Sequence, residues 1–142
     1  MNTLSHLLHG KGNEVWSIGP DATVYDAIHL MAEKGIGALV VLKDESPVGV
    51  ISERDYARDV VLKDRSSKET LVKEIMSDKV VYADPHQTVD ECLAVMTEKR
   101  IRHLPVMDGD QMIGLVSMGD LVKVIIAEQK LTIDQLERYI TG

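Results

Sequence analysis

The fold is decided by a stretch of sequence that occurs twice. Residues 20–42 read PDATVYDAIHLMAEKGIGALVVL, and 65 positions later residues 85–107 read PHQTVDECLAVMTEKRIRHLPVM. Extended to residues 18–61 and 83–126, the two copies align without a gap and share 12 identities in 44 positions, where about three are expected by chance. Repetition of this length predicts two copies of one supersecondary unit that bury a core together.

Each copy carries the same succession of signals. Thr23 and Thr88 stand where a helix N-cap is expected, and Thr88 with Glu91 has the spacing of a capping box. The residues behind each cap place a helical apolar stripe on one face: Val24, Ala27, Ile28 and Met31, then Val89, Cys92, Leu93 and Met96. Two apolar runs and a second apolar-periodic segment follow, which predict two strands and a closing helix: 38–42, 48–52 and 56–62, then 104–107, 112–117 and 121–127. With a short extended piece in front, each unit is predicted to be βαββα, an α/β (α+β) fold.

The boundaries follow from the repeat. We divide the chain into repeat 1 at 11–65, repeat 2 at 70–128 and a C-terminal helix at 129–142. The C-terminal helix is predicted to begin at a cap of Thr132 and Gln135 and carries an apolar face of Ile133, Leu136 and Ile140. Two interpretations of that face stay open: packing on the repeats, or a dimer contact.

The composition narrows the class of protein. With 23 acidic and 16 basic residues the formal net charge is −7, which disfavours a nucleic-acid partner. The single cysteine, Cys92, predicts a reducing compartment and hence a cytoplasmic location. Neither a secretory signal nor an apolar run of membrane-spanning length is present, so we expect no membrane insertion.

A Gly-x-x-Ser-x-x-Asp motif occurs in both copies, at residues 49–55 and 114–120. Glycine permits a close approach, Ser offers a hydroxyl, and a carboxylate suits the paired hydroxyls of a ribose. The alternative is that Ser and Asp only cap the closing helix. On the residues alone, both interpretations stay open.

A basic run, Lys99-Arg100-Ile101-Arg102-His103, lies between helix and strand in copy two. Arg grips phosphate oxygens in a bidentate fork, so this run is a candidate phosphate site, to which Arg54 and Arg58 add charge. A solvated basic turn is the alternative. The counterpart in copy one, residues 35–38, has no positive charge. The two sites are therefore expected to differ in affinity or ligand.

Other chemistries find little support. The five histidines lack a metal-ligand spacing, no His and acid complete a triad with Ser52 or Ser117, and no phosphate-binding Gly-x-x-x-x-Gly-Lys loop is present. We expect no enzyme activity and neither a metal nor a catalytic cofactor.

The paired motifs closely resemble a tandem pair of CBS domains, the Bateman module, over roughly residues 11–128, and the opening 8–18 stretch is similar to that of the stand-alone bacterial type. The resemblance implies that two repeats pack by their sheets around a pseudo-twofold axis and leave two clefts. These clefts bind AMP, ADP, ATP, or sometimes NAD or S-adenosylmethionine. It also implies a homodimer.

The resemblance assigns roles to particular residues. Asp55 and Asp120 would hold ribose, with Ser52 and Ser117 near the ribose or phosphate. The adenine base would be flanked by Val50, Leu115, Val81 and Trp16. Phosphate would meet Arg102 and His103 beside Ile101 in the cleft of Asp55, supported by Arg54 and Arg58. In the cleft of Asp120, Ile36 and Gly37 replace contacting residues, and Lys11 or Arg102 would have to reach the phosphate.

The leading hypothesis is a regulatory adenine-nucleotide sensor, with AMP as the expected ligand, that acts on a regulated protein through ligand-dependent conformation or dimer packing. The alternative is an interaction scaffold for dimerisation, with non-functional clefts.

Overall fold

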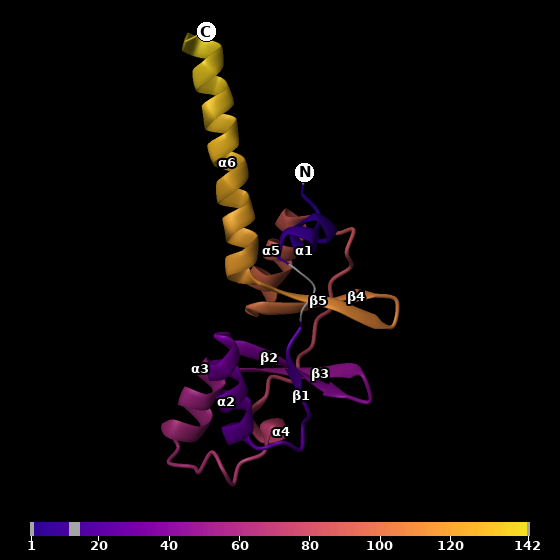
Figure 1. Ribbon diagram of the computed structural model, residues 1–142, viewed down its shortest axis with the longest axis vertical. Helices are drawn as coiled ribbons and strands as arrows, with labels where there is room; N and C mark the ends of the chain where they lie inside the picture. Colours follow the sequence, from indigo (N-terminus) through magenta and orange to yellow (C-terminus); the bar gives the residue numbers. More distant parts are fainter. Residues whose placement is uncertain (1, 12–14, 142) are drawn as a thin grey trace.

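The computed structural model describes residues 2–11 and 15–141, with the backbone alone at Lys11. Figure 1 shows two stacked halves whose small sheets face each other across the junction, while their helices lie on the outer sides. The helices are α1 Leu4–Lys11, α2 Val24–Lys34, α3 Glu53–Tyr56, α4 Val72–Ile75, α5 Val89–Lys99 and α6 Met118–Thr141, with a π-helical turn η1 at Ala57–Val61. The strands are β1 Ser17–Ile18, β2 Ala38–Lys43, β3 Ser46–Ser52, β4 His103–Asp108 and β5 Gln111–Ser117.

The two sheets repeat each other in register. β2 pairs with β3 and β4 pairs with β5, both antiparallel, and every Cα pairing in one hairpin has its counterpart 65 residues on in the other. Even the irregularity recurs, between Val41 and Leu42 and between Val106 and Met107. The predicted fold of two βαββα units is confirmed, although the extended piece of repeat 2 is only a single bridge between Ala83 and Val106.

The long helix of each repeat begins at its predicted cap. The Thr23 hydroxyl accepts from the Asp26 N–H and the Thr88 hydroxyl from the Glu91 N–H, both at 3.1 Å. The full capping box lies elsewhere: at Ser52, each side chain of the Ser52–Asp55 pair accepts from the backbone N–H of the other. The predicted N-caps are thus confirmed, while the second bond expected from Glu91 is not among those of α5.

The segments that precede the two repeats are exchanged. α1 precedes repeat 1 but docks on repeat 2, where the Leu4 N–H donates to the Gln87 carbonyl at 3.0 Å. α4 precedes repeat 2 but docks on repeat 1, where the Val72 N–H donates to the Ala22 carbonyl at 2.8 Å. Sequence analysis missed α1, because the two exchanged helices are 68 residues apart and fall out of the 65-residue alignment.

A glycine in each β-hairpin admits the exchanged segment. A Cβ on Gly49 would lie 2.7 Å from the Met76 sulfur, and a Cβ on Gly114 would lie 2.6 Å from a Leu8 methyl carbon. Real side chains do not approach so closely, so both positions require glycine. The close approach that the Gly-x-x-Ser-x-x-Asp motif predicts is therefore an approach of the protein's own segments.

Two buried clusters result, one for each half. The repeat 1 cluster takes Val72 and Ile75 from α4, and the repeat 2 cluster takes Leu4 and Leu8 from α1. Neither half is complete without the chain segment that belongs, by sequence order, to the other. The exchange therefore fixes the two repeats face to face.

The C-terminal helix differs from its prediction. α6 runs without a break from Met118 to Thr141, and the Thr132 hydroxyl donates to the Glu128 carbonyl at 3.0 Å instead of capping a new helix. The reason is that strong helix formers fill residues 127–131 with no Gly or Pro to interrupt them. The helix also does not pack on the repeats: residues 126–141 are all exposed. Within the described ranges, no helix combines the length and apolar character that a bilayer crossing needs.

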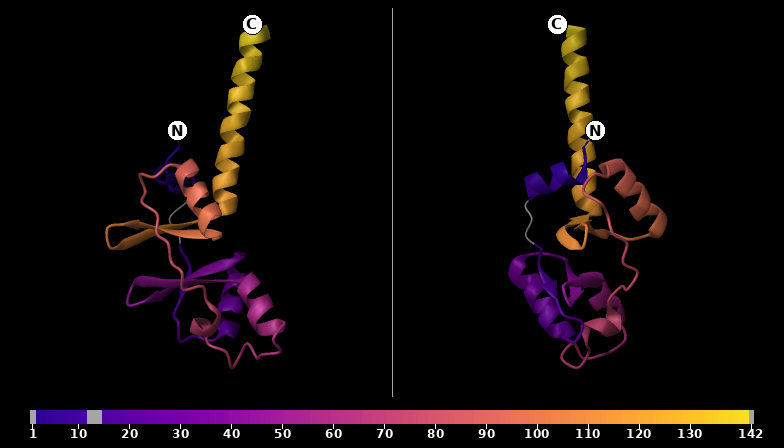
Figure 2. Two further views of the ribbon diagram at one scale, coloured as in Figure 1. Left: turned by 180° about the vertical axis from the view of Figure 1, so that it is seen from behind. Right: turned by 90° about the vertical axis from the view of Figure 1, so that its right-hand side faces the viewer.

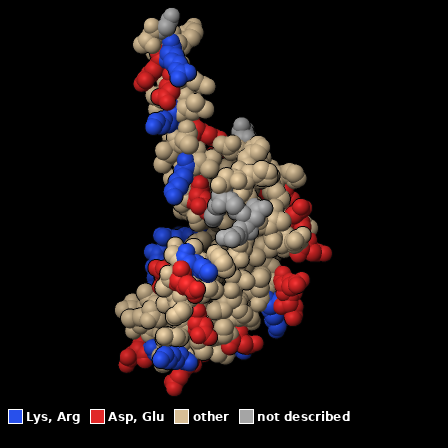
Figure 3. All heavy atoms as spheres, viewed as in Figure 1, with Lys and Arg blue, Asp and Glu red and all other residues tan. Residues whose placement is uncertain are grey.

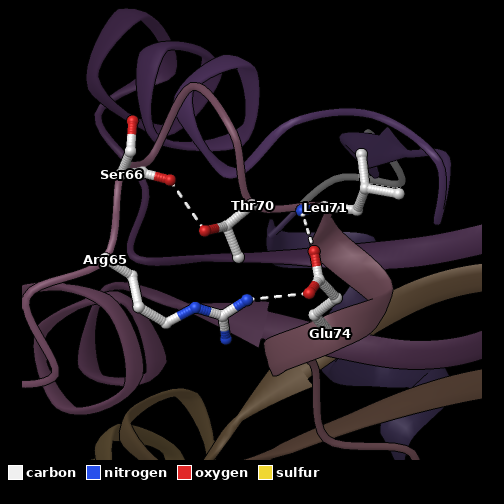
Figure 4. A network of polar contacts seen from close by, with 5 residues as sticks. All are labelled: Arg65, Ser66, Thr70, Leu71 and Glu74. Atoms are coloured by element: carbon white, nitrogen blue, oxygen red, sulfur yellow. Dashed lines mark hydrogen bonds and ion pairs between the residues drawn. The ribbon is translucent and has the colours of Figure 1, made fainter.

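The linker between the repeats is held by a small polar network (Figure 4). The Arg65 guanidinium lies 2.7 Å from the Glu74 carboxylate, whose other oxygen accepts from the Leu71 N–H at 2.7 Å. The buried Thr70 hydroxyl donates to the Ser66 carbonyl. These bonds fold the charged linker back over the start of α4, and they lower the pKa of Glu74 below its usual 4.5.

The exchange predicts that α1 is part of the repeat 2 core. Replacing the fully buried Leu4 (Leu4→Ala) is expected to lower the free energy of unfolding by about 3 kcal/mol, since it leaves a cavity. His9→Ala, on the exposed side of the same helix, should change it by less than about 0.5 kcal/mol. Urea unfolding followed by circular dichroism measures both. Equal small effects would show that α1 is only loosely attached.

The linker network predicts a pH dependence. Because the folded-state pKa of Glu74 lies below 4.5, its stabilisation is fully present above pH 4.5 and is lost as the pH falls through the lowered value. Glu74→Gln should therefore lower the melting temperature at pH 7, and the gap to wild type should close on acidification. The exposed linker variant Glu69→Gln is the control. A gap that stays constant from pH 7 to acid would contradict this account.

Candidate functional site

A cleft lies between the repeats beside Asp55. Its volume is about 370 Å³, and we call it the Asp55 cleft; its lining residues are Gly37, Val50, Ser52, Arg54, Asp55, Arg58, Ser77, Lys79, Arg100, Ile101, Arg102 and His103. Repeat 1 supplies the end of β3 and the start of α3, and repeat 2 supplies the turn between α5 and β4. Two sequence motifs that lie far apart in the chain therefore meet in one inter-repeat cleft.

The Asp55 cleft is strongly basic. Five of its twelve lining residues are Lys or Arg and one is acidic, in a protein whose net charge is −7. Among the residues that the structure describes, none of these five side chains makes an ion pair or hydrogen bond. Figure 3 shows basic side chains gathered at the waist between the two halves. Such a concentration reverses the overall field locally and attracts an anion.

The turn that presents the basic side chains is fixed by its backbone. α5 ends at Arg100, whose φ of 56° and ψ of 44° place it in the left-handed region. Two residues on, the Arg102 carbonyl accepts from the Met118 N–H at 2.9 Å, which ties the turn to the start of α6. A non-glycine residue at such a helix end is strained. Arg100 keeps a costly conformation at a position where its side chain lines the cleft.

Ser52 and Asp55 serve as a helix cap, as one of the two open interpretations predicts. The Asp55 Oδ2 accepts from the Ser52 N–H at 2.9 Å and from the Ser52 hydroxyl at 3.0 Å. Both residues also line the cleft. Since the cap contacts use Oδ2 alone, Oδ1 is available as an acceptor. Capping and ligand binding are therefore compatible in this motif.

A second cleft of about 360 Å³ lies on the other side of the junction, and we call it the Trp16 cleft. Its lining residues are Val15, Trp16, Ile36, Gly37, Ala38, His103, Leu115 and Ser117. Neither Lys nor Arg is among them, although the Lys34 ammonium lies 4.2 Å from the centroid of the Trp16 ring. The sequence analysis expects Trp16, Ile36, Gly37, Leu115 and Ser117 to share a cleft, and the structure brings these five together.

Three of the expected site residues lie elsewhere. Asp120 caps α6, with its Oδ2 accepting from the Ser117 N–H at 2.8 Å, and lines a separate hollow between α1 and α6 that includes Asn2 and Lys123. Val81 lines neither cleft and packs against the repeat 2 core. The side chain of Lys11 lies outside the described residues.

The two clefts differ by three Arg-to-Gly replacements. At positions related by the 65-residue repeat, Arg54 corresponds to Gly119, Arg100 to Gly35 and Arg102 to Gly37. Each Arg lines the Asp55 cleft, whereas Gly37 lines both clefts without a side chain. The predicted charge difference between the clefts therefore arises from three matched positions.

Sequence reasoning missed some lining residues. Ser77 and Lys79 line the Asp55 cleft because they follow the exchanged α4, and the Ser77 N–H donates to the Val50 carbonyl at 2.9 Å. The missing signal was a second offset: Lys11 and Lys79 stand 68 residues apart, as α1 and α4 do. Arg100 was part of the basic run but was not assigned to the site, and Val15 and Ala38 carried no signal at all.

Comparison with known proteins gives a consistent result. The family model described as "CBS domain" matches twice, at residues 13–61 and 72–127. A mitochondrial CBS domain-containing protein of Arabidopsis thaliana, CBSX3, is 38% identical over 150 residues, which cover 99% of this chain and 72% of that protein.

Solved structures agree with this result. A putative signal-transduction protein with CBS domains from Burkholderia ambifaria is 53% identical with a TM-score of 0.84, over 90% of this chain and 96% of that one. The CBS domain pair of protein MJ0100, solved with 5′-methylthioadenosine and S-adenosyl-L-methionine, has the same fold with a TM-score of 0.78 over 90% of this chain and 98% of that one, at 18% identity.

The strained turn predicts a pair of opposite stability effects. Arg100→Gly should raise the free energy of unfolding by about 1 kcal/mol, because glycine adopts the left-handed conformation without strain. The matched variant Gly35→Arg, at the equivalent φ of 66°, should lower it by a similar amount. Urea unfolding measures both. If Arg100→Gly is destabilising, the side chain makes contacts that outweigh the strain.

Proposed function

Because the chain belongs to the CBS-domain family and carries two copies of the domain, we propose that it is a regulatory module that binds an adenine nucleotide in the Asp55 cleft. The observation that carries the proposal is the set of five unpaired cations around one carboxylate, between the two repeats. A nucleotide matches this charge pattern, since it joins an anionic phosphate to a sugar with neighbouring hydroxyls.

In this proposal each part of the cleft recognises one part of the nucleotide. The ribose hydroxyls donate to Asp55, whose Oδ1 is not used by the cap. The phosphate accepts from Arg102 and its basic neighbours at the end of α5. The base lies along the apolar Val50 and Ile101. Ser52 holds Asp55 in place through the cap, so it orients the acceptor as well as lining the site.

AMP is the first ligand we propose, with ADP, ATP and NAD as relatives of the same chemistry. The related pair of protein MJ0100 was solved with two adenosine-containing compounds, which supports an adenosyl ligand here. Five cations exceed what one phosphate requires, so added phosphates should strengthen binding in the Asp55 cleft. The Trp16 cleft, with neither Lys nor Arg in its lining, should hold phosphate more weakly.

We propose that the module regulates without catalysing. Neither cleft combines a nucleophile with a positioned base among the described residues, and the Burkholderia match spans 96% of its chain, which leaves little room for a catalytic domain in that relative. Ligand binding across the junction would bias the packing of the two repeats, or of two copies in a homodimer, and a regulated protein would respond to that change. The bias equals the ligand's difference in affinity for the two states.

Calorimetric titration with adenosine, AMP and ATP tests the proposal. Wild type is expected to bind AMP and ATP more tightly than adenosine. Arg102→Ala removes a charge-assisted phosphate bond worth about 2 kcal/mol, which weakens AMP binding about 30-fold. Adenosine binding should hardly change.

Arg138→Ala, on the exposed end of α6, is the matched control and should bind like wild type. Absence of heat with every adenine compound at about 1 mM, where even weak sites fill, would end the proposal. Equal weakening by Arg102→Ala and Arg138→Ala would show that only the overall charge matters.

A further inference from the structure

The second half of α6 has nothing to pack against in the single chain. Figures 1 and 2 show it projecting away from both halves in every view, and residues 126–141 are all exposed. A helical segment of this length is marginal in water without tertiary packing. A partner surface is therefore needed for the helix to persist.

The exposed face of α6 has the spacing of a coiled coil. Large apolar residues with one glutamine recur at alternating intervals of four and three: Val122, Ile126, Gln129, Ile133, Leu136 and Ile140. We call this set the α6 seam. In heptad terms its a positions are all Ile, and its d positions are Val, Gln and Leu, a pattern that favours two strands. Its apolar members are between 38% and 80% exposed.

We propose that the α6 seam pairs with the α6 seam of a second copy of this chain, as a two-stranded antiparallel coiled coil. This inference rests on the homodimer of the proposed function and names its interface. A second copy is the natural occupant, because a regular heptad seam is complementary to another helix with the same repeat.

The charges beside the seam favour the antiparallel orientation. The e positions are Lys123, Lys130 and Glu137. In an antiparallel pair e positions face e positions, so Lys123 of each chain meets the partner subunit's Glu137, which gives two attractive pairs against one Lys130 repulsion at the twofold axis. A parallel pair would place Ile125 beside the partner subunit's Lys130 and Thr132 beside the partner subunit's Glu137, without any opposite charges.

The antiparallel pairing also covers the whole seam. Val122 at the base of one helix then layers against the partner subunit's Ile140, and Ile126 against the partner subunit's Leu136. The exposed tip of each helix, where Ile140 is 80% exposed, lies against the body of the other copy. A parallel pair would leave both tips together and away from the bodies.

Sedimentation equilibrium of the full chain tests the pairing. Wild type is expected to be a dimer, and Ile133→Asp should weaken dimerisation at least about 30-fold, because it buries an unpaired charge in the seam. Leu131→Asp is the matched control: it places the same charge on an equally exposed residue, 59% against 54%, outside the seam. Thermal unfolding of both variants monitors the fold.

Cysteine cross-linking tests the orientation. Mixing a Val122→Cys chain with an Ile140→Cys chain should give a disulfide between the two, whereas Ile140→Cys alone should give none. The native Cys92 does not compete, since it is 1% exposed and burial raises the pKa of its thiol to about 11.

The contrary outcomes are distinct. A monomeric wild type would overturn both the homodimer and the helix pairing. A dimer that survives Ile133→Asp, or that is weakened equally by Leu131→Asp, would overturn the pairing and leave the homodimer standing. Self-linking of Ile140→Cys would overturn the antiparallel arrangement. Nucleotide binding is unaffected by any of these results, because Ile133 and Leu131 line neither cleft.

Discussion

Mutual repulsion among five cations is the constraint on which the account depends. Arg54, Arg58, Lys79, Arg100 and Arg102 surround one cleft, and no described carboxylate pairs with any of them. Like charges held this close raise the energy of the empty site, all the more because water reaches a cleft less freely than an open surface. An anion that enters the cleft removes the repulsion. The strained backbone of Arg100 points the same way, since the equivalent residue in repeat 1 is a relaxed glycine at a φ of 66°.

The exchange of α1 and α4 holds this charged site together. A module whose halves met only through their sheets would separate under such repulsion more easily. Here each half buries a segment that belongs to the other, and Gly49 and Gly114 let those segments lie directly on the hairpins. The same exchange brings Ser77 and Lys79 to the Asp55 cleft. The scaffold and the binding site are therefore products of one packing arrangement, which also explains how a ligand in the cleft could alter the packing.

Sequence alone predicted most of the fold and the basic side of the site. The 65-residue repeat located both hairpins and both long helices, because caps, apolar stripes and turns are local signals. The exchange could not be predicted, since which half α1 covers depends on long-range packing of Leu4 and Leu8. The unbroken α6 was missed for a different reason: Thr132 fits a cap as well as a helix interior, and the continuous helix formers around it decide. Asp120 was expected in an inter-repeat cleft by analogy with Asp55, but it lines a hollow formed with α1, the element that sequence analysis missed.

The most direct test of the central claim is a crystal structure of the protein grown with AMP. The account predicts that the phosphate lies within hydrogen-bond distance of the Arg102 guanidinium and that a ribose hydroxyl donates to Asp55 Oδ1. The cap from Ser52 to Oδ2 should stay intact. A nucleotide bound elsewhere, with Asp55 engaged only in its cap and the basic side chains turned to solvent, would contradict it.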